Sequence, residues 1–581
     1  MEKNIKLLKS HEEAVKDEAF NELKKRGFIF DASENDFQGE INGNGYGYFP
    51  IKVKIPENFP NAVPQVFVER KSLGKRIPHV EENGKLCIVP NTGILLDSNK
   101  PKELIIESIE RASKLIQDGL SEKNKEDFLT EYQAYWTGEA SIKSVCDPDK
   151  GSREVELITL SKDDQDGLFL FDDYSSARNW AAKINHKIIN REKAFLINLT
   201  EAFYPPDYNK PVLQSEIFDL IKSFTSLSEY RRLNSWLQKN RLPAVIVISL
   251  PLNSREQVFI GMMVKALTGK LKDKSQNGFY PGMGPVWREL LLGHKNPVTK
   301  ISINRLDSSY LLKRGGGNNS LLDKTVAIIG CGAIGSHLVM KLASLGIGNL
   351  RLVDSENFKA ENLHRHVLGM TDIDKNKALC LTKLLNQNYP HLNVQHKENL
   401  IEEVMKKEPD FILDSDLVLI ALGDETLELS LNDSLPQNLK RLHVWVEPLS
   451  IGGHLLLTGL KNVGCFRCLF GNDSIFGIYN QAAFAAAGQN FQRSYSGCAG
   501  VFTPFSAVDA DKAANEAATI AARVLLDKEE SNMLISWRGY EDDFINEGYK
   551  FSSRGKIFST NERRIETNFV NPICSTCGIR I

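Results

Sequence analysis

A glycine-rich turn at residues 330–335 restricts the possible folds of this chain more than any other segment. The stretch VAIIGCGAIGSHLVMKLASLG places Gly330, Gly332 and Gly335 in a GxGxxG pattern. The turn follows an apolar, strand-like run and opens a helix with leucines on one face, which is the context in which this pattern binds nucleotides. Glycines let the backbone approach a phosphate, and the helix N-terminus supplies free N–H groups. The turn alone fits NAD as well as ATP.

Buried-strand runs surround this turn. VAIIG, LRLVD and LVLIAL are separated by helical patterns, and this alternation indicates a parallel sheet with crossover helices. The run LRLVD ends in Asp354, where a carboxylate can accept hydrogen bonds from ribose hydroxyls. We therefore predict a Rossmann-like α/β nucleotide-binding domain over residues 301–581.

Charged residues beyond the second strand indicate whether the turn binds ATP or NAD. The segment SENFKAENLHRHVLGMTDIDKNKA resembles the signature of the ThiF/MoeB and ubiquitin-activating family. By that motif, the positions that contact ATP are Asn362, Arg365 and Lys377. Asp424 matches an aspartate implicated in holding Mg²⁺. The resemblance implies adenylation of a carboxylate with ATP, a reaction that builds negative charge beside these cations. An NAD-dependent oxidoreductase would need neither the cations nor the aspartate.

The family also places an arginine near the phosphates from a segment upstream of the glycine turn. Arg305 and Arg314 are the candidates in this chain, and we rank Arg305 first.

Two CxxC pairs lie far apart in the sequence. They comprise Cys465, Cys468, Cys574 and Cys577. Four thiolates form a closed tetrahedral zinc site that is structural, because no position remains for water. The alternative is two unconnected, reduced pairs. The family resemblance favours structural Zn²⁺, because many relatives carry paired CxxC knuckles near the end of this fold.

Another cysteine precedes a long alanine-rich helix. Cys498 lies in SGCAG, where small neighbours leave the thiol accessible and a nearby helix start stabilises a thiolate. In the ThiF-related family this position resembles the cysteine that takes the activated protein as a thioester. We expect Cys331 and Cys380 to be packing residues.

Residues 1–145 predict an α+β domain, with a first helix, strands near 36–54 and 63–69, and helices near 102–118 and 125–136. The segments IPENFPNAVPQVFV and RIPHVEENGKLCIVP resemble ubiquitin-conjugating enzymes, in which a Phe-Pro-x-x-x-Pro element precedes a histidine turn and a Gly-x-x-Cys element. By that resemblance, Cys87 accepts a thioester.

This segment departs from the conjugating family at the histidine. The usual His-Pro-Asn is His79-Val80-Glu81 here, and the interval to Cys87 is short. Asn83 and Asn91 are candidates to replace the missing asparagine, and we expect His79 to orient the turn.

Residues 146–300 alternate apolar runs with polar helical stretches and predict an α/β linker domain without a chemical motif. This block could be a spacer, a dimer element or a docking surface for the substrate protein.

The layout of the whole chain resembles bacterial fusion proteins encoded beside cGAS-like nucleotidyltransferases in CBASS antiphage operons. The resemblance implies an enzyme that adenylates a protein C-terminus, forms thioesters on Cys498 and then Cys87, and conjugates the protein to an acceptor amine. It also implies a cGAS-like nucleotidyltransferase as the protein substrate, and a homodimer. The alternative is a MoeB/ThiF-type sulfur-carrier adenylyltransferase with an N-terminal binding module, for which Cys87 is dispensable. A pure scaffold would not explain two cysteines in such contexts.

Composition excludes several other classes of protein. The 581 residues carry a formal charge of −2, which does not favour electrostatic capture of nucleic acid. The sequence contains no run of about 18 apolar residues, so we expect no membrane span. The charged first residues do not resemble a signal peptide, and nine cysteines without such a signal indicate reduced thiols, so we expect a cytoplasmic protein.

Overall fold

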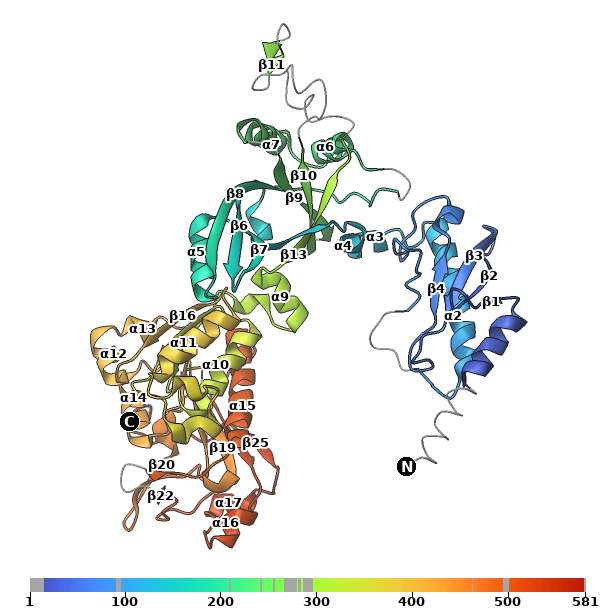
Figure 1. The fold of residues 1–581 in the computed structure, drawn as a ribbon. Helices are drawn as coiled ribbons and strands as arrows, with labels where there is room; N and C mark the ends of the chain where they lie inside the picture. Colours follow the sequence, from blue (N-terminus) through green and yellow to red (C-terminus); the bar gives the residue numbers. More distant parts are fainter. Residues whose placement is uncertain are drawn as a thin grey trace. The chain divides into compact units, whose positions relative to one another are not determined.

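The computed structural model describes residues 15–89, 96–207, 211–240, 243–253, 256–265, 279–280, 284–285, 296–461, 463–494 and 501–578 (Figure 1). The chain forms two compact units. The first combines residues 1–177 and 188–306, and the second combines residues 178–187 and 307–581.

The first unit begins with an antiparallel sheet covered by a long helix. Its strands, in their order across the sheet, are β1 (Ile29–Asp31), β2 (Asp36–Asn42), β3 (Tyr48–Lys54) and β4 (Gln65–Val68). Alternate residues of β3 are buried, as expected for a sheet with one covered face. They share a core with Ile105 and Ile116 of α2 (Pro101–Leu120). The expected α+β domain is confirmed.

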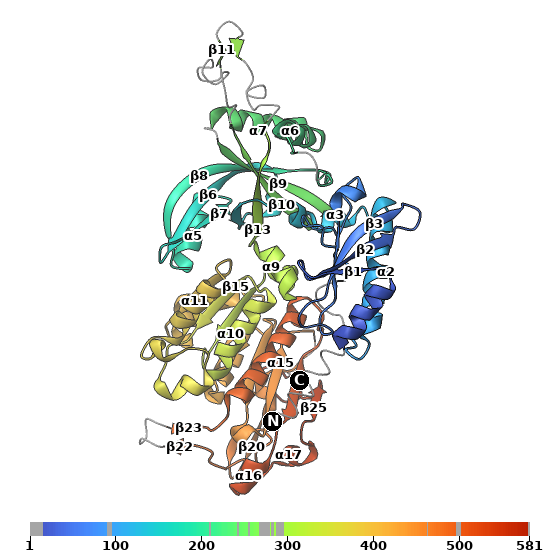
Figure 2. The same cartoon turned by 45° about the vertical axis from the view of Figure 1, so that its right-hand side comes forward.

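A closed barrel forms the rest of the first unit (Figure 2). Its strand order is β10-β13-β5-β7-β6-β8-β9. Figure 2 labels all of these strands except β5. The strands are β5 (Ala140–Ser144), β6 (Arg153–Lys162), β7 (Gln165–Phe171), β8 (Lys187–Asn198), β9 (Ala244–Asn253), β10 (Glu256–Val264) and β13 (Thr299–Arg305). The helices that alternate with these strands in the sequence are α5 (Tyr174–Lys183), most of which belongs to the second unit, α6 (Gln214–Ser223) and α7 (Leu227–Lys239).

The barrel continues directly from the first sheet domain. Between them lie α3 (Asp127–Thr130) and α4 (Tyr132–Tyr135), and Tyr132 and Trp136 belong to the same core as α6 and α7. The strands β5 and β13 pair in parallel, with Ile142 opposite Ile303. The expected boundary at 145/146 therefore falls just after one strand of the barrel, and that at 300/301 falls inside another.

The second unit is built on an eight-stranded sheet in the order β16-β15-β14-β17-β18-β19-β24-β25. Its strands are β14 (Thr325–Ile329), β15 (Asn349–Val353), β16 (Asn393–Lys397), β17 (Leu417–Ile420), β18 (Arg441–Val446), β19 (Gly452–Thr458), β24 (Met533–Arg538) and β25 (Arg563–Glu566). The strands from β16 to β18 are parallel, and the last three pair antiparallel. The expected Rossmann-like α/β fold is confirmed.

Helices cover both faces of this sheet because the parallel strands are apolar on both sides. On one face, α10 (Ala333–Leu345) and α15 (Ala507–Leu525) run side by side over Val326 and Ile328 (Figure 2). On the other, α12 (Ile401–Lys407) and α14 (Glu425–Ser434) cover Ala327 and Ile329. The other helices of this unit are α9 (Ser308–Gly315), α11 (Lys377–Asn388), α13 (Asp410–Leu413), α16 (Asp542–Asn546) and α17 (Ser553–Ile557).

Residues 313–320 begin as helix, although their sequence KRGGGNNS is typical of a flexible turn or linker. The last turn of α9 reaches Gly315, and the following Gly316 ends the helix with a φ of 77°, a left-handed conformation that favours glycine. Across the described ranges, every helix is too short or too polar to cross a bilayer.

Candidate functional site

The glycine turn lies between β14 and α10, at the carboxyl end of the parallel strands. Gly330 has a φ of 94°, and a Cβ there would lie 2.6 Å from the Ala421 carbonyl oxygen. A Cβ on Gly335 would lie 2.0 Å from the Gly330 oxygen. A Cβ on Gly332, the N-cap of α10, would meet nothing within 4 Å. Two glycines therefore close the turn, and the third leaves open the space that a phosphate would occupy.

Two side chains hold the backbone of Cys331 within this turn. Its N–H donates to Oδ2 of Asp354 at 2.7 Å, and its carbonyl lies 2.8 Å from Nε2 of His366. Nδ1 of His366 accepts from the Leu368 N–H, so Nε2 is the atom that carries the proton. Burial lowers the pKa of His366 to about 4, which keeps the ring neutral. Sequence reasoning assigned His366 no role, although it directly follows Arg365.

Burial raises the pKa of the Asp354 carboxyl, and the hydrogen bonds that it accepts oppose this shift. Oδ1 of Asp354 accepts from the Glu356 N–H at 2.8 Å. The carboxylate predicted to bind ribose therefore also fixes the glycine turn.

Lys377 is the first residue of α11, and its side chain is almost fully buried. Its Nζ lies 2.5 Å from Oε2 of Glu356, and this bond lowers the pKa of Glu356. Lys377 also interacts electrostatically with Asp354. Asn376 caps α11 through Leu379 N–H and donates to the Asp354 carbonyl at 2.8 Å. The structure therefore brings Lys377 to the end of the strand that carries Asp354.

Arg365 and Asn362 lie in one short helical segment, Ala360–Arg365. The Arg365 guanidinium lies 5.1 Å from the centre of the Phe505 ring, and burial lowers its pKa. Within the described residues, Arg365 forms no ion pair with a carboxylate. A half-buried cation without a counter-ion is suited to bind phosphate.

Asp424 begins α14, just beyond β17. Its Oδ1 accepts from the N–H groups of Thr426 and Leu427 at 3.0 and 3.1 Å, which caps the helix. Ala421, three residues before Asp424, has its carbonyl oxygen 2.6 Å from where a Cβ on Gly330 would lie. The loop that carries Asp424 therefore adjoins the glycine turn. Asp424 is exposed and can still offer a carboxylate oxygen to Mg²⁺.

The structure does not bring Arg305 into this group. Arg305 ends β13 in the first unit, where it is buried, donates to the Gln257 carbonyl at 2.6 Å and lies over the Phe259 ring. Its guanidinium thus bonds and packs within the barrel. Arg314 is exposed on α9 in the second unit, with Nη1 bonded to the Tyr310 hydroxyl at 3.0 Å.

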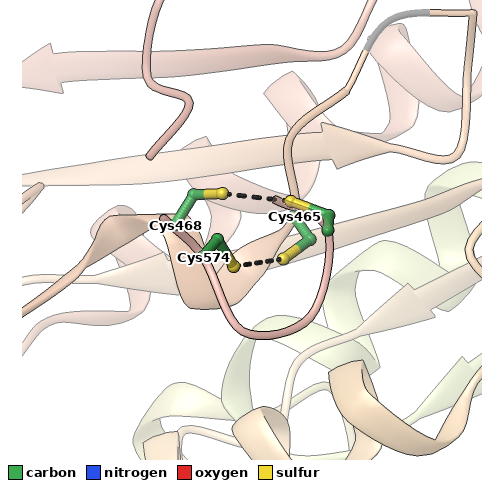
Figure 3. A group of neighbouring side chains, drawn as sticks. Cys465, Cys468 and Cys574 are labelled. Carbon is green, nitrogen blue, oxygen red and sulfur yellow. Dashed lines mark hydrogen bonds between the residues drawn. The ribbon is translucent and has the colours of Figure 1, made fainter. Parts of the chain in front are cut away.

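The four cysteines of the CxxC pairs meet at one place (Figure 3). Figure 3 labels three of them, Cys465, Cys468 and Cys574. All four sulfur atoms lie within 4.8 Å of one another. Sγ of Cys465 is 3.7 Å from Sγ of Cys574, and Sγ of Cys468 is 3.3 Å from Sγ of Cys577. A tetrahedral site with Zn–S bonds of about 2.3 Å needs sulfurs about 3.8 Å apart, so this arrangement fits zinc.

The surroundings of these cysteines also suit a metal with four thiolates. The Cys468 thiol and burial raise the pKa of Cys465, so without a cation its ionised form is costly. Arg441, fully buried, and Arg467 interact electrostatically with the cluster and would offset the negative charge of four thiolates around Zn²⁺.

Cys87 lies on a turn that is bonded along β4. The N–H of Val68 donates to the Gly84 carbonyl and that of Leu86 to the Val66 carbonyl, both at 2.8 Å. Gly84 has a φ of 87°, and a Cβ there would lie 2.3 Å from the Val68 oxygen. The sheet therefore fixes the position of Cys87, whose side chain is exposed.

Carboxylates dominate the surroundings of the Cys87 thiol. Its Sγ donates to Oε1 of Glu81 at 3.7 Å. Neighbouring protein atoms that exclude part of the water around the exposed thiol, together with Glu81 and Glu131, raise the pKa of Cys87 to about 11, although Lys85 opposes the shift. The resting thiol is therefore protonated near neutral pH.

His79 is held by two carboxylates beside this turn. Nδ1 lies 2.7 Å from Glu131 and Nε2 lies 2.9 Å from Asp127, and these bonds raise the pKa of His79 to about 9. Its carbonyl accepts from the Cys87 N–H at 2.9 Å. Since both ring nitrogens are bonded, His79 orients the turn, as expected, and is not available as a base.

Five further residues were considered in the sequence analysis. Two of them, Cys498 and Asn91, lie outside the described residues. Asn83 is exposed in the turn, and its Oδ1 accepts from the Lys85 N–H at 2.9 Å. Cys331 and Cys380 are buried, in line with a packing role.

Comparison with known families identifies two parts of the chain. Residues 16–145 match the prokaryotic E2 family B, and residues 309–544 match the ThiF family. These ranges contain the Cys87 turn and the glycine turn.

Individual relatives span different shares of the chain. The ATP-dependent ubiquitin transferase-like protein Cap2 of Pseudomonas aeruginosa (strain BWHPSA011 / Pa011) is 24% identical over 528 residues, 87% of this chain and 90% of that protein. The sulfur carrier protein ThiS adenylyltransferase of Escherichia coli (strain K12) is 31% identical over 157 residues, 26% of this chain and 61% of that protein. A crystal structure of E. coli MccB with ATP has a TM-score of 0.32 and 19% identity, covering 45% of this chain and 68% of that chain.

Proposed function

Because this chain joins a domain of the prokaryotic E2 family B to a domain of the ThiF family, we propose that it is an ATP-dependent, ubiquitin-transferase-like enzyme. It activates the C-terminal carboxylate of a protein and conjugates that protein to an amine. The observation that carries the proposal is one chain with both an exposed cysteine on a fixed turn and a glycine turn that interacts electrostatically with Lys377.

Activation takes place at the glycine turn. The turn and the start of α10 bind the phosphates, Asp354 receives the ribose and Asp424 holds Mg²⁺. A carboxylate oxygen attacks the α-phosphorus, the bond to pyrophosphate breaks, and an acyl-adenylate forms. Arg365 and Lys377 stabilise the charge that develops, and Asn362 contacts the nucleotide from the Arg365 segment.

Two cysteines then carry the acyl group. The Cys498 thiolate attacks the acyl-adenylate and AMP leaves, and the Cys87 thiolate attacks the resulting thioester and frees Cys498. An amine of the acceptor finally attacks the thioester on Cys87 and forms an amide.

Finer features of the proposal follow the resemblance of the whole layout to antiphage fusion proteins. We propose a cGAS-like nucleotidyltransferase as the protein substrate, a homodimer, a cytoplasmic location and structural Zn²⁺ in the four-cysteine cluster. The sulfur spacing and the buried Arg441 support the zinc assignment.

The test combines ATP, Mg²⁺ and a candidate protein substrate, and detects adducts that thiol reagents release. Cys498→Ala should abolish every adduct on the conjugating domain, whereas Cys87→Ala should leave a charged Cys498. Cys87→Ser should trap an oxyester that resists thiols. Target modification that survives Cys87→Ala would refute the relay and favour a sulfur-carrier adenylyltransferase, which stops before Cys87.

The metal role of Asp424 needs a variant that preserves the cap of α14. Asparagine is as good an N-cap as aspartate but lacks the charge. Asp424→Asn should therefore remove ATP–pyrophosphate exchange without unfolding the protein, and retained exchange would exclude Asp424 from binding Mg²⁺.

A further inference from the structure

Helix α14 carries two buried polar side chains one turn apart. Glu428 is 3% exposed and Asn432 is fully buried. Positions four apart lie above one another on a helix, so these two residues and the N-cap Asp424 form one row. Neither buried residue has a part in the adenylation chemistry described above.

Glu428 supports the loop that carries Asp424. Its Oε1 accepts from the Gly423 N–H at 3.2 Å, and its Oε2 lies 3.0 Å from Nδ1 of His443. His443 is fully buried on β18, and its Nε2 has no hydrogen-bond partner within the described part of the chain. Nδ1 therefore carries the proton and donates to Glu428.

Asn432 supports the four-cysteine cluster. Its Oδ1 accepts from the Phe466 N–H at 3.0 Å, and its Nδ2 lies 3.5 Å from Sγ of Cys465. The next residue, Asp433, pairs with Arg467 and accepts from the Thr576 hydroxyl at 2.6 Å, beside Cys577. One helix thus bonds to both halves of the cluster.

Aromatic stacking provides a second link between Glu428 and Asn432. The ring of His443 lies parallel to that of Phe466, with centroids 4.3 Å apart and an interplanar angle of 3°. Phe466 lies between two of the cysteines in the sequence, and His443 bonds to Glu428. Two short routes therefore connect the cluster with Glu428, one along α14 from Asn432 and the other through Phe466 and His443. These side chains are all buried.

We propose that α14 positions the Asp424 loop according to the state of the four-cysteine cluster, with Glu428, Asn432 and His443 as positioning residues. The inference rests on the proposed role of Asp424 in holding Mg²⁺. A cluster that holds its metal fixes Phe466 and Asn432, which fix α14 and, through Glu428, the Gly423 N–H. Loss of the metal would loosen the loop and weaken Mg²⁺ binding at a distance.

The test measures the Mg²⁺ concentration that half-saturates binding of a fluorescent, non-hydrolysable ATP analogue, with zinc content determined in parallel. Removing zinc from the wild-type protein with a chelator should raise this concentration roughly fivefold, the order expected when one buried hydrogen bond is lost. Glu428→Gln should raise it with zinc still bound, and zinc removal should then add little. Ser430→Ala, on the exposed face of α14, is the matched control and should behave as the wild type.

Two outcomes would overturn the inference. Zinc removal could leave the Mg²⁺ requirement of the wild type unchanged, or raise it equally in Glu428→Gln. If zinc removal unfolds the chain by circular dichroism, Asn432→Ser with zinc retained takes its place, and an unchanged Mg²⁺ requirement would then refute the coupling. An Asp424→Asn variant with a normal Mg²⁺ requirement would instead refute the proposed role of Asp424, and so the two failures are distinguishable.

Discussion

At the scale of single residues, desolvation and acidic neighbours together lower the reactivity of the Cys87 thiol. With a pKa of about 11, about one thiol in ten thousand is ionised at pH 7. Such a thiol resists adventitious alkylation and oxidation, because the thiolate is the reactive form. In the proposed relay, such a thiol would accept an acyl group only from an activated ester, such as a thioester.

Glu81→Gln should increase the reactivity of Cys87 near neutral pH. The carboxylate raises the thiol pKa by repelling the thiolate, so its removal should lower that pKa. The rate of alkylation by iodoacetamide, followed against pH by mass spectrometry of the Cys87 peptide, should shift to lower pH. Lys85→Met should shift it to higher pH, because Lys85 favours the thiolate. Superimposable profiles for Glu81→Gln and wild type would contradict this account.

At the scale of elements, the turn from β14 to α10 packs tightly at one glycine and leaves room for a phosphate at another. Gly335 brings the first turn of α10 against the Gly330 carbonyl, and Gly332 faces open space. Residues of the same type, three positions apart, therefore have separable tasks. One serves packing, and the other leaves room for a ligand.

Alanine at these two glycines should separate stability from nucleotide binding. Gly335→Ala would place a Cβ 2.0 Å from a backbone oxygen and should lower the free energy of unfolding by about 1–3 kcal/mol. Gly332→Ala should change stability by less than about 0.5 kcal/mol but weaken ATP binding, because its methyl group enters the phosphate space. Thermal unfolding and nucleotide titration check both. Equal stability losses would contradict the assignment.

Features that depend on short sequence patterns could be predicted, whereas contacts between residues brought together by distant strands could not. The glycine turn and Asp354 follow from short-range patterns, and the structure places them together. The family resemblance led us to rank Arg305 first for the upstream arginine, but Arg305 lies on β13 of the barrel, where its guanidinium donates to the Gln257 carbonyl. Likewise, the part that His366 plays depends on a fold that brings it to Cys331, which its neighbours in sequence do not reveal.

At the scale of the whole molecule, the barrel joins segments that sequence patterns separate. β5 lies between β13 and β7, and Nε1 of Trp136 donates to the Gly261 carbonyl at 2.7 Å. Pairing between such distant strands cannot be read from the alternation of apolar residues. The end of the segment that matches the prokaryotic E2 family B, residues 16–145, is therefore part of the barrel.

Fragments of the chain should reveal this dependence. A fragment of residues 146–581 lacks β5 and Trp136, which leaves β13 and β7 with open edges. A fragment that begins at residue 131 keeps both. We expect the shorter fragment to have the lower Tm and to aggregate, as measured by scanning calorimetry and light scattering. Equal Tm values would show that the barrel closes without β5.

The presence of Cys87 and the glycine turn in one polypeptide also bears on kinetics. Covalent connection gives Cys87 a local concentration near that turn that does not depend on the amount of protein in solution. Transfer of an acyl group within one chain would then be first order and insensitive to dilution. Transfer between separate chains would slow in proportion to their concentration.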